Sequence, residues 1–520
     1  MNSRTAGIAK SHMLIWAAAL SLGACASIPG GPAAPTVALR SHADAIKVAE
    51  RITWGVNGFT ERVLAEQGLA RYLEGQLHPP TGDPLPAEVS ARVASLTVSQ
   101  KPAADLATEM EQQRRDADAI SDDAQKKAAQ EAYQQRLNAL AREAAARSLM
   151  RALYSRDQLK EQMTWFWMNH FNVHQYKSNL RVLVADYEER AIRPYALGRF
   201  RDLVGATLRH PAMIRYLDNE QNAAGHLNEN YARELLELHT LGVDGGYTQR
   251  DVQELARVLT GVGVNLTAKA PNVRAELREQ YVRDGLFEFN PARHDYGIKT
   301  ILGHSIRGRG LAEVDEVIDV LCRHPATARF VSRRIGMFFV ADDPPPALVE
   351  RMARTFGATD GDIAAVLRTM IESPEFARSL GGKFKDPVHY VVSAVRLAYD
   401  DKPILNANPM VGWLNRLGEA FYNRQTPDGY PLTEAAWSSS GQMTARFEIA
   451  RAIGSGTSGL FRTEGENPVE RPAFPRLANA LYYRSIEGAL RDGTRAALDK
   501  ATSQQEWNVF LLSSPDFMYR

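Results

Sequence analysis

Cysteine is scarce in this chain: only Cys25 and Cys322 occur among its 520 residues. A disulfide within the body of the protein would need a second cysteine beyond residue 25, so none is expected there. Cys322 follows Val314, Ile318 and Leu321 at helical spacing, which places it on an apolar face. The pattern predicts a small buried thiol and not a reactive nucleophile.

An excess of charge of one sign is also missing. Lys and Arg number 62 and Asp and Glu number 61, for a formal net charge of +1. If the first 24 residues are removed, Arg4 and Lys10 go with them, and 60 basic residues face 61 acidic ones. This balance gives no indication of binding to nucleic acid or to an acidic surface.

The common catalytic motifs are absent as well. The chain has no phosphate-binding loop of the Walker type, no zinc-protease His-Glu-x-x-His, no nucleophile elbow and no Cys-x-x-Cys pair. Residues 454–459 spell the Gly-x-Gly-x-x-Gly of dinucleotide-binding proteins, but they follow a helical segment where that motif requires a buried strand. No standard motif therefore fixes a reaction.

What the chain does have begins with an export signal. Arg4 and Lys10 form a basic region, and the mostly apolar residues 13–22 follow it. That run is too short to span a bilayer as a helix and has the length of a signal-peptide core. Residues 1–24 are therefore predicted to be a signal peptide.

The signal ends in Leu22-Gly23-Ala24-Cys25, which resembles the lipobox of bacterial lipoproteins. The resemblance implies that Cys25 is lipidated, becomes the first residue of the mature chain and anchors the protein to a membrane. Ala26, where an Asp would favour retention in the inner membrane, implies an exported protein at the outer membrane or in the periplasm. The alternative is an ordinary secretory signal that is cut elsewhere.

The remainder divides into a tether and a body. Residues 25–40 are rich in Pro, Gly and Ala and predict an extended tether behind the lipidated cysteine. Residues 41–520 exceed what one core usually supports, so a helical body of one to three sub-domains is expected. The segments with helical periodicity are 46–77, 102–150, 156–174, 180–208, 228–241, 248–261, 311–323, 326–340, 347–356, 360–371 and 387–399.

Strand signals are few, so we predict a mainly α fold, a multi-helix body with one small β-hairpin. Residues 286–289 and 299–302 are expected to form that hairpin. Residues 103–146 are rich in Ala, Glu, Gln and Arg and predict a charged helical arm with a narrow apolar stripe. A partner-binding coiled coil and a solvated, partly ordered helix are both consistent with this segment.

Two histidines stand out in the first candidate site. If one helix runs through both, His170 and His174 lie on the same face as Met163 and Phe166. Their i, i+4 spacing would bring both rings within reach of one divalent metal such as zinc, which needs at least one further ligand. The alternative is two core histidines that bond to the main chain or to an amide such as Asn169.

The second candidate site is the polar helix predicted at residues 228–241. Tyr231 and Leu235 would face inward with His239, and Glu234 would stand at the edge of that face. A carboxylate beside a buried histidine can acquire a raised pKa, which is the usual route to acid or base catalysis. The alternative is a helix-loop-helix whose polar groups only satisfy caps and pairs.

Three smaller predictions accompany this helix. Arg233 and Glu237 are expected to form an ordinary i, i+4 ion pair. Thr248 is expected to cap the following helix. Beyond it, His294 and Asp295 form a third candidate site in the expected hairpin loop. Adjacent side chains in an extended segment point apart, so a direct dyad is not expected, although such a loop can still carry function.

Residues 227–243, 245–249 and 256–261 together resemble the signature of a large bacterial family known as domain of unknown function 1800. Further blocks agree in order at residues 51–55, 166–171, 294–303 and 511–517, and the similarity spans 43–520. The resemblance implies a mostly helical, exported bacterial protein, without assigned catalytic residues. This chain has Val262 where the family pattern usually has Trp, and His174 is less typical of the family than His170, which weakens the metal interpretation.

Genes of this family commonly lie beside those of exported proteins similar to alkaline phosphatases and sulfatases, known as domain of unknown function 1501. The resemblance suggests such a protein as a partner. Two hypotheses follow. In the first, His170, Glu234 and His239, with His294, surround one buried polar pocket for acid/base or metal-assisted hydrolysis, or binding, of an envelope or extracellular polymer. In the second, the protein is a non-catalytic anchored scaffold for the sulfatase- or phosphatase-like partner.

Overall fold

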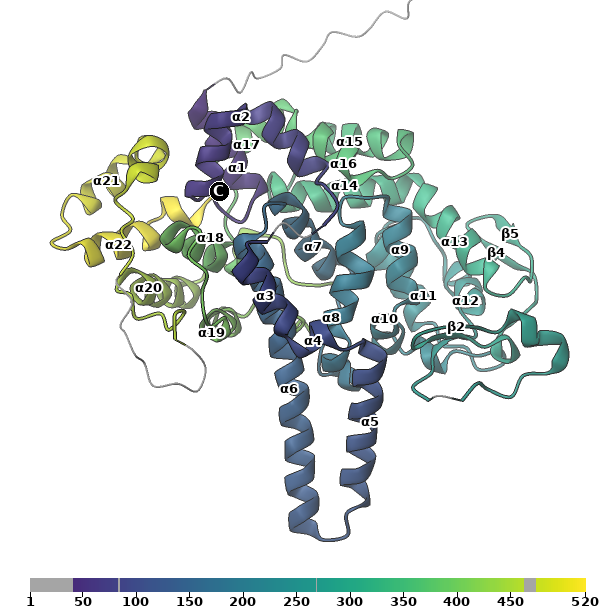
Figure 1. The fold of residues 1–520 in the computed structure, drawn as a ribbon. Helices are drawn as coiled ribbons and strands as arrows, with labels where there is room; N and C mark the ends of the chain where they lie inside the picture. The colour runs from purple at the N-terminus through teal and green to yellow at the C-terminus, as the bar shows by residue number, and fades with distance from the viewer. Residues whose placement is uncertain (1–40, 83–84, 268, 463–473) are drawn as a thin grey trace, which may run out of the picture. The chain divides into compact units, whose positions relative to one another are not determined.

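The computed structural model describes residues 41–82, 85–267, 269–462 and 474–520 (Figure 1). The signal peptide, Cys25 and the tether predicted for residues 1–40 lie outside these ranges. Within them, no helix is long and apolar enough to cross a membrane. The buried hydrophobic side chains form one continuous cluster that draws on elements from α1 (His42–Ile52) to α22 (Gln504–Ser513).

The predicted mainly α fold is confirmed. The N-terminal part contains α2 (Gly58–Leu77), α3 (Ala87–Ser95), α4 (Thr97–Gln100), α5 (Ala103–Ala119), α6 (Asp123–Tyr154) and α7 (Gln158–His170). The middle contains η1 (Lys177–Val182), α8 (Val184–Asp186), η2 (Tyr187–Ile192), η3 (Arg193–Tyr195), α9 (Phe200–Arg209), α10 (Pro211–Tyr216), η4 (Asn219–Gln221), α11 (Asn230–Glu234), η5 (Leu235–Thr240), α12 (Gln249–Val258), η6 (Ala275–Gln280) and η7 (Pro291–Arg293). The last part contains α13 (Ala312–Arg323), α14 (Pro325–Phe339), α15 (Pro346–Ala358), α16 (Ile363–Ile371), α17 (Pro374–Ser379), α18 (Pro387–Tyr399), α19 (Asn408–Leu417), η8 (Glu434–Ala436), α20 (Ser440–Gly454), η9 (Tyr482–Ile486), η10 (Glu487–Ala489), α21 (Asp492–Leu498) and η11 (Asp516–Met518).

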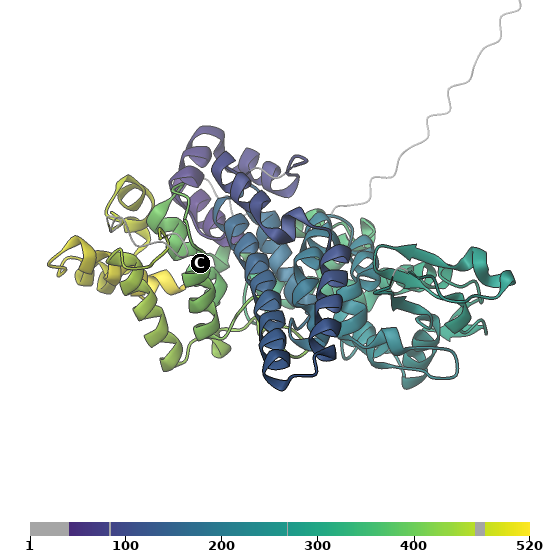
Figure 2. The same cartoon turned by 60° about the horizontal axis from the view of Figure 1, so that its bottom comes forward.

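Helices α5 and α6 lie side by side and extend from the rest of the body (Figures 1 and 2). The apolar stripe of this segment is buried between the two helices and their neighbours at Leu106, Met110, Tyr133, Leu137 and Leu140. The outer faces carry charged residues, some of them paired, such as Arg114 with Glu111 and Asp118. The apolar stripe therefore stabilises the pairing of α5 with α6, and the surfaces that this helical pair presents to solvent are polar.

Several predicted helices are shorter or more irregular than the periodicity suggested. The segment 180–208 is divided into η1, α8, η2, η3 and α9, and Pro194, which lies in η3, has no amide hydrogen to continue an α-helix at that point. The signature segment starts as α11 and continues as the π-helix η5, where the amide of Leu241 donates to the oxygen of Leu236. π-Helical turns are rare and often occur at functional sites.

Some local predictions are confirmed. Thr248 caps α12, and Thr248 and Asp251 exchange the two hydrogen bonds of a capping box. Cys322 is buried on the apolar face of α13, and burial raises the pKa of its thiol. The glycine-rich residues 454–459 begin at the last residue of helix α20 and do not follow a strand, as expected for an accidental match to the dinucleotide motif.

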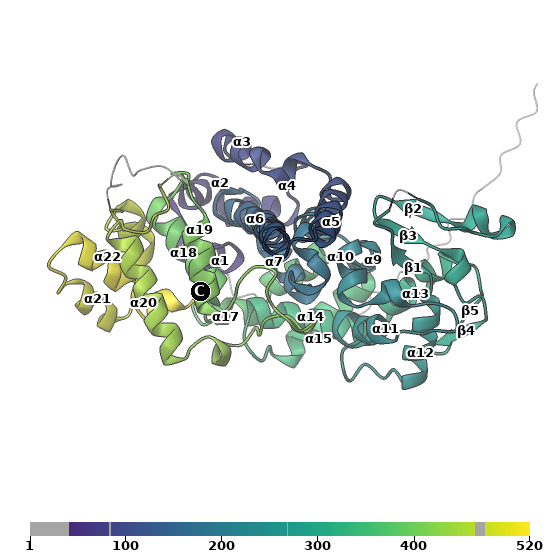
Figure 3. The ribbon, with the colours of Figure 1, turned by 90° about the horizontal axis from the view of Figure 1, so that it is seen from below.

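The expected β-hairpin is wrong in its pairing. Both segments are strands, but β3 (Phe287–Phe289) lies between β1 (Val262–Val264) and β2 (Val282–Asp284), and β4 (Lys299–Ile301) pairs with β5 (His304–Ile306). The turn between β4 and β5 decides this arrangement, since Leu302 and Gly303 both have positive φ, at 50° and 81°, as a tight two-residue hairpin requires. Strand β4 then packs on α12, and β5 packs on α13 (Figure 3).

Candidate functional site

His170 and His239 lie side by side in the interior. His170 is the last residue of α7, and His239 lies in the π-helix η5. Their ring centroids are 6.2 Å apart, and Nε2 of His170 lies 3.0 Å from the main-chain oxygen of His239. Both residues are at most 2% exposed. Two segments that are distant in the chain therefore bring two of the predicted site residues together.

Both imidazoles are neutral at neutral pH. Burial lowers the pKa of His239 to about 3, and burial together with the charge of Arg334 lowers the pKa of His170 well below its usual value. Because a carbonyl oxygen only accepts, Nε2 of His170 donates the hydrogen bond and Nδ1 is the unprotonated nitrogen. Nδ1 of His170 and Nε2 of His239 are buried without a hydrogen-bond partner among the described residues. Most buried polar atoms in proteins are satisfied, so these two retain capacity for a ligand or solvent.

Arg334, on α14, brings a positive charge close enough to His170 to affect it. Its side chain is partly exposed, while its Nε is buried without a partner. Within the described ranges its guanidinium forms no ion pair, and Asp428 attracts it only at longer range. Phe330, one turn earlier on α14, places its ring 5.9 Å from that of His170. An unpaired guanidinium of this kind is well suited to binding a carboxylate, sulfate or phosphate group.

Glu234 lies near this centre in the chain but does not complete a catalytic triad. Burial and the neighbouring charge of Glu237 raise the pKa of its carboxyl group. In the part of the chain that the structure describes, no hydrogen bond joins this carboxyl group to His170 or His239. The three residues therefore do not form the hydrogen-bonded arrangement that acid/base catalysis would use directly.

The metal-site interpretation of His170 and His174 assumed that one helix carries both residues, and this assumption is wrong. Helix α7 ends at His170, so His174 is not one turn further along it. Burial lowers the pKa of His174, and its Nδ1 is buried without a partner among the residues described. No group of three or more His, Cys, Asp or Glu side chains in the described ranges is arranged to hold a metal ion.

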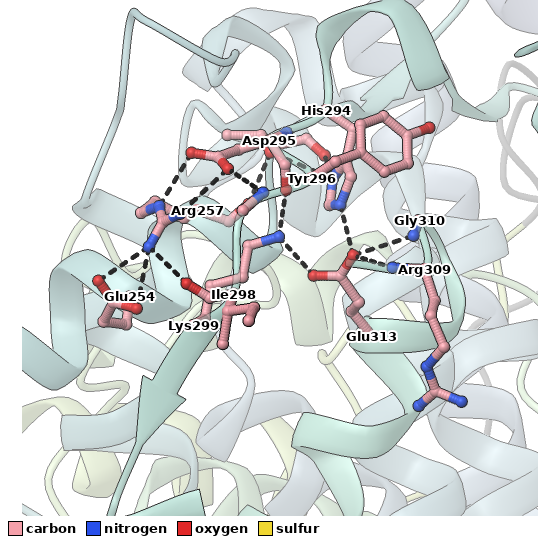
Figure 4. A network of polar contacts seen from close by, with 12 residues as sticks. Glu254, Arg257, His294, Asp295, Tyr296, Ile298, Lys299, Arg309, Gly310 and Glu313 are labelled. Atoms are coloured by element: carbon pink, nitrogen blue, oxygen red, sulfur yellow. Dashed lines mark hydrogen bonds and ion pairs between the residues drawn. The ribbon is translucent and has the colours of Figure 1, made fainter. Parts of the chain in front are cut away.

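His294 belongs to a separate buried network around Glu313 (Figure 4). One carboxylate oxygen of Glu313 accepts from Nε2 of His294 at 2.8 Å, and the other accepts from Nζ of Lys299 at 2.5 Å. The amides of Arg309 and Gly310 donate to the same carboxylate at 2.6 and 2.9 Å. The side chains of His294, Lys299 and Glu313 are all 0% exposed. Four donors saturate this carboxylate, which makes it a buried anchor for strand β4 and the start of α13.

Asp295 faces the opposite way, as expected for adjacent residues in an extended segment. It accepts two hydrogen bonds from Arg257 at 2.9 and 3.1 Å, and Arg257 also binds Glu254 (Figure 4). The hydrogen bond from Arg257 lowers the pKa of Asp295 to about 2. Asp295 therefore ties its loop to α12, and the contacts of both Asp295 and His294 support a role in holding the loops in place.

Sequence reasoning missed Arg334, Lys299 and Glu313. A signal for two of them exists in the chain. Arg334 lies four residues after Phe330 and four before Phe338, and Glu313 lies four residues before Val317. A charged residue on an otherwise apolar helix face is costly to bury without a partner, so it marks a specific interaction.

Comparison with known proteins gives one family. A model of the family described as "Protein of unknown function (DUF1800)" matches residues 47–519. Neither the curated proteins nor the solved structures yielded a match.

Proposed function

The chain belongs to this family of unknown function, DUF1800, and from the geometry of the histidine centre we propose that it binds an acidic saccharide unit of an envelope or extracellular polymer. The histidine centre consists of His170, His239 and Arg334. The observation that carries the proposal is the unpaired guanidinium of Arg334, whose charge acts on His170, together with the two buried imidazole nitrogens of His170 and His239 that lack partners among the described residues.

The chemistry of these groups favours a ligand that is both anionic and rich in hydroxyl groups. Arg334 remains protonated and binds a carboxylate or sulfate with two parallel hydrogen bonds. Nδ1 of His170 is an acceptor, and because this residue is only 2% exposed, it suits a water that a ligand hydroxyl holds. Acidic saccharides present both kinds of group on one ring.

Binding is better supported than acid/base hydrolysis. A general base works best when its pKa lies near the working pH. The pKa of His239 is about 3, and that of His170 is also well below its usual value, so both imidazoles are weak bases. Glu234 has a raised pKa but no hydrogen bond to either ring within the described residues.

The location of the protein is part of the proposal. Residues 1–24 and Cys25 support export and a lipid anchor, which would place the body where envelope and extracellular polymers occur. Labelling of the expressed protein with radioactive palmitate tests this. Label in the wild type and none in Cys25→Ala is expected, whereas label that survives the substitution contradicts the anchor.

Arg334→Met and Arg333→Met form a matched pair for the binding test. Arg333 is the exposed neighbour on the same helix and is paired with Asp343. Retardation in gels that contain alginate, a sulfated polysaccharide or neutral dextran measures binding. We expect the wild type and Arg333→Met to be retarded by an acidic polymer and not by dextran. Arg334→Met should bind the acidic polymer about tenfold more weakly, because it loses a charge-assisted hydrogen bond. Equal loss in both variants, or no preference of the wild type for acidic polymers, contradicts the proposal.

A second candidate function is a scaffold for a sulfatase- or phosphatase-like exported protein. The helical pair α5 and α6 supports it, because polar helix surfaces that extend from a body are accessible to a partner. Copurification from cell envelopes, with and without charge reversal at Arg115 and Glu131 on exposed arm faces, tests this role. Recovery of the same partner in equal amounts with both proteins contradicts it.

A further inference from the structure

A cavity of about 510 Å³ lies where the two ends of the described chain meet. Helix α1 contributes to one side, α18 and the segment before it to another, and residues 485–491 and the C-terminal residues to the rest. The chain ends close to α1, and Arg520 donates to the main-chain oxygen of Arg51 at 3.0 Å (Figure 1). A volume of this size falls within the range of small-molecule sites in proteins.

The lining of this cavity, here called the terminal cavity, combines apolar side chains with the charged groups of Lys47, Glu50, Lys385, Arg491, Asp516 and Arg520. Its apolar side chains include Ile46, Leu380, Leu397, Ile486, Leu490 and Phe517. They come from elements that the core holds in place, such as α1 and α18. None of the histidine-centre residues lines it, so it is independent of the site proposed above.

One buried ammonium group faces this apolar lining. Lys385 is 2% exposed, and its Nζ lies 2.8 Å from Glu50 and 4.0 Å from the centre of the Phe517 ring. Burial lowers the pKa of Lys385, and the ion pair with Glu50 opposes that shift. Glu50 is the ion-pair partner of this lysine among the described residues, so ammonium donors remain for another acceptor.

The surroundings of Lys385 carry an excess of positive charge. Besides Glu50, the charges close enough to affect Lys385 include the guanidinium groups of Arg520 and Arg446. Ser485, which also lines the cavity, has a buried hydroxyl without a hydrogen-bond partner among the described residues. An anionic head group would therefore meet an ammonium donor, a hydroxyl donor and a favourable field.

We propose that the terminal cavity binds an anionic amphiphile, a molecule with one aliphatic chain and a carboxylate or phosphate head group. The aliphatic chain lies against the leucine and isoleucine side chains, where burial of apolar surface stabilises it. The head group lies at Lys385 and Ser485. This site is distinct from the histidine centre, and the two can be tested separately.

Titration calorimetry with dodecanoate, dodecanol and dodecyltrimethylammonium, each below its micellar concentration, tests the proposal on the whole exported body. We expect dodecanoate to bind at least tenfold more tightly than the alcohol and the cation to bind more weakly still. Lys385→Gln should abolish the preference for dodecanoate over dodecanol. Lys383→Gln is the matched control, because Lys383 is also buried but binds Asp342 and does not line the cavity.

A second variant keeps the test decisive if Lys385→Gln does not fold. Ala489 is exposed and lines the cavity, so Ala489→Trp should fill part of it at little cost to the fold. Binding of both dodecanoate and dodecanol should fall at least tenfold in this variant. Absence of dodecanoate binding to the wild type, equal affinity for the alcohol, or unchanged binding by Ala489→Trp would overturn the proposal.

Discussion

The carboxylate of Glu313 accepts a hydrogen bond from Nε2 of His294 at 2.8 Å, and both side chains are completely removed from solvent. Nδ1 of the same histidine lies 2.8 Å from the main-chain oxygen of Thr260. Both ring nitrogens therefore face oxygen acceptors, and the imidazole connects the end of α12 to the start of α13. The contact places a charged carboxylate in the interior, so removing that charge should destabilise the fold.

Glu313→Gln should lower the free energy of unfolding by about 3–5 kcal/mol. The amide group removes the negative charge that balances buried Lys299 and turns an NH₂ group towards donors. Glu316→Gln is the control on the same helix, because Glu316 pairs with Arg309 at the surface, and it should cost less than about 1 kcal/mol. Urea denaturation followed by circular dichroism measures both; equal midpoints for the two variants would refute the prediction.

His239→Gln should weaken the pH dependence of stability. The pKa of His239 is about 3 in the folded protein, and about 6.5 is usual for an unfolded histidine. Between these values the unfolded chain binds a proton that the folded protein does not, so the wild type loses stability as the pH falls. The wild type should lose about 1.4 kcal/mol more than the variant for each pH unit below about 6.5. Urea denaturation at pH 7, 6 and 5 measures the free energy of unfolding of both proteins. The same decrease with pH in the wild type and in His239→Gln would contradict the prediction.

Asp295→Asn should change stability in a lower pH window. The hydrogen bond from Arg257 holds the pKa of Asp295 at about 2, below the value of about 3.9 in an unfolded chain. The contribution of this pair is complete above about pH 4 and is lost as the pH falls through about 2. The wild type should thus be more stable than Asp295→Asn at pH 7, and the difference should shrink below pH 4. Asp244→Asn, at an exposed position, serves as the control and should show no such change.

Gly429→Ala should destabilise the protein more than Gly418→Ala. Both glycines have positive φ, at 75° and 79°, so both alanines pay the backbone cost of about 1–2 kcal/mol. A Cβ at Gly429 would also lie 2.1 Å from the main-chain oxygen of Asn169, whereas one at Gly418 would meet nothing within 4 Å. Comparing the melting temperatures of the two variants separates the backbone cost of positive φ, which both share, from the steric clash with Asn169, which only Gly429→Ala has. A melting temperature of Gly429→Ala at or above that of Gly418→Ala would show that the loop moves freely away from α7.

Local sequence rules predicted the parts of the fold that depend on local interactions. The capping box at Thr248 and Asp251 involves groups three residues apart, and the buried face of α13 follows from its apolar spacing. The ion pair expected between Arg233 and Glu237 is wrong, even though it too is local. Arg233 binds Glu229, while Glu237 accepts from Tyr247, because the π-helix η5 changes the spacing that places residues i and i+4 above each other.

By itself, the sequence determined a mainly helical body, its family and the polar character of the signature segment, because periodicity, caps and motif order are properties of neighbouring residues. Only the tertiary structure decided which polar groups meet. His170 bonds to the main chain of His239 and lies within the electrostatic influence of Arg334, whereas His294 binds Glu313 instead of joining them. The physical reason is that a buried polar side chain is satisfied by whatever packing brings within about 3 Å, and residues distant in the chain supply those partners.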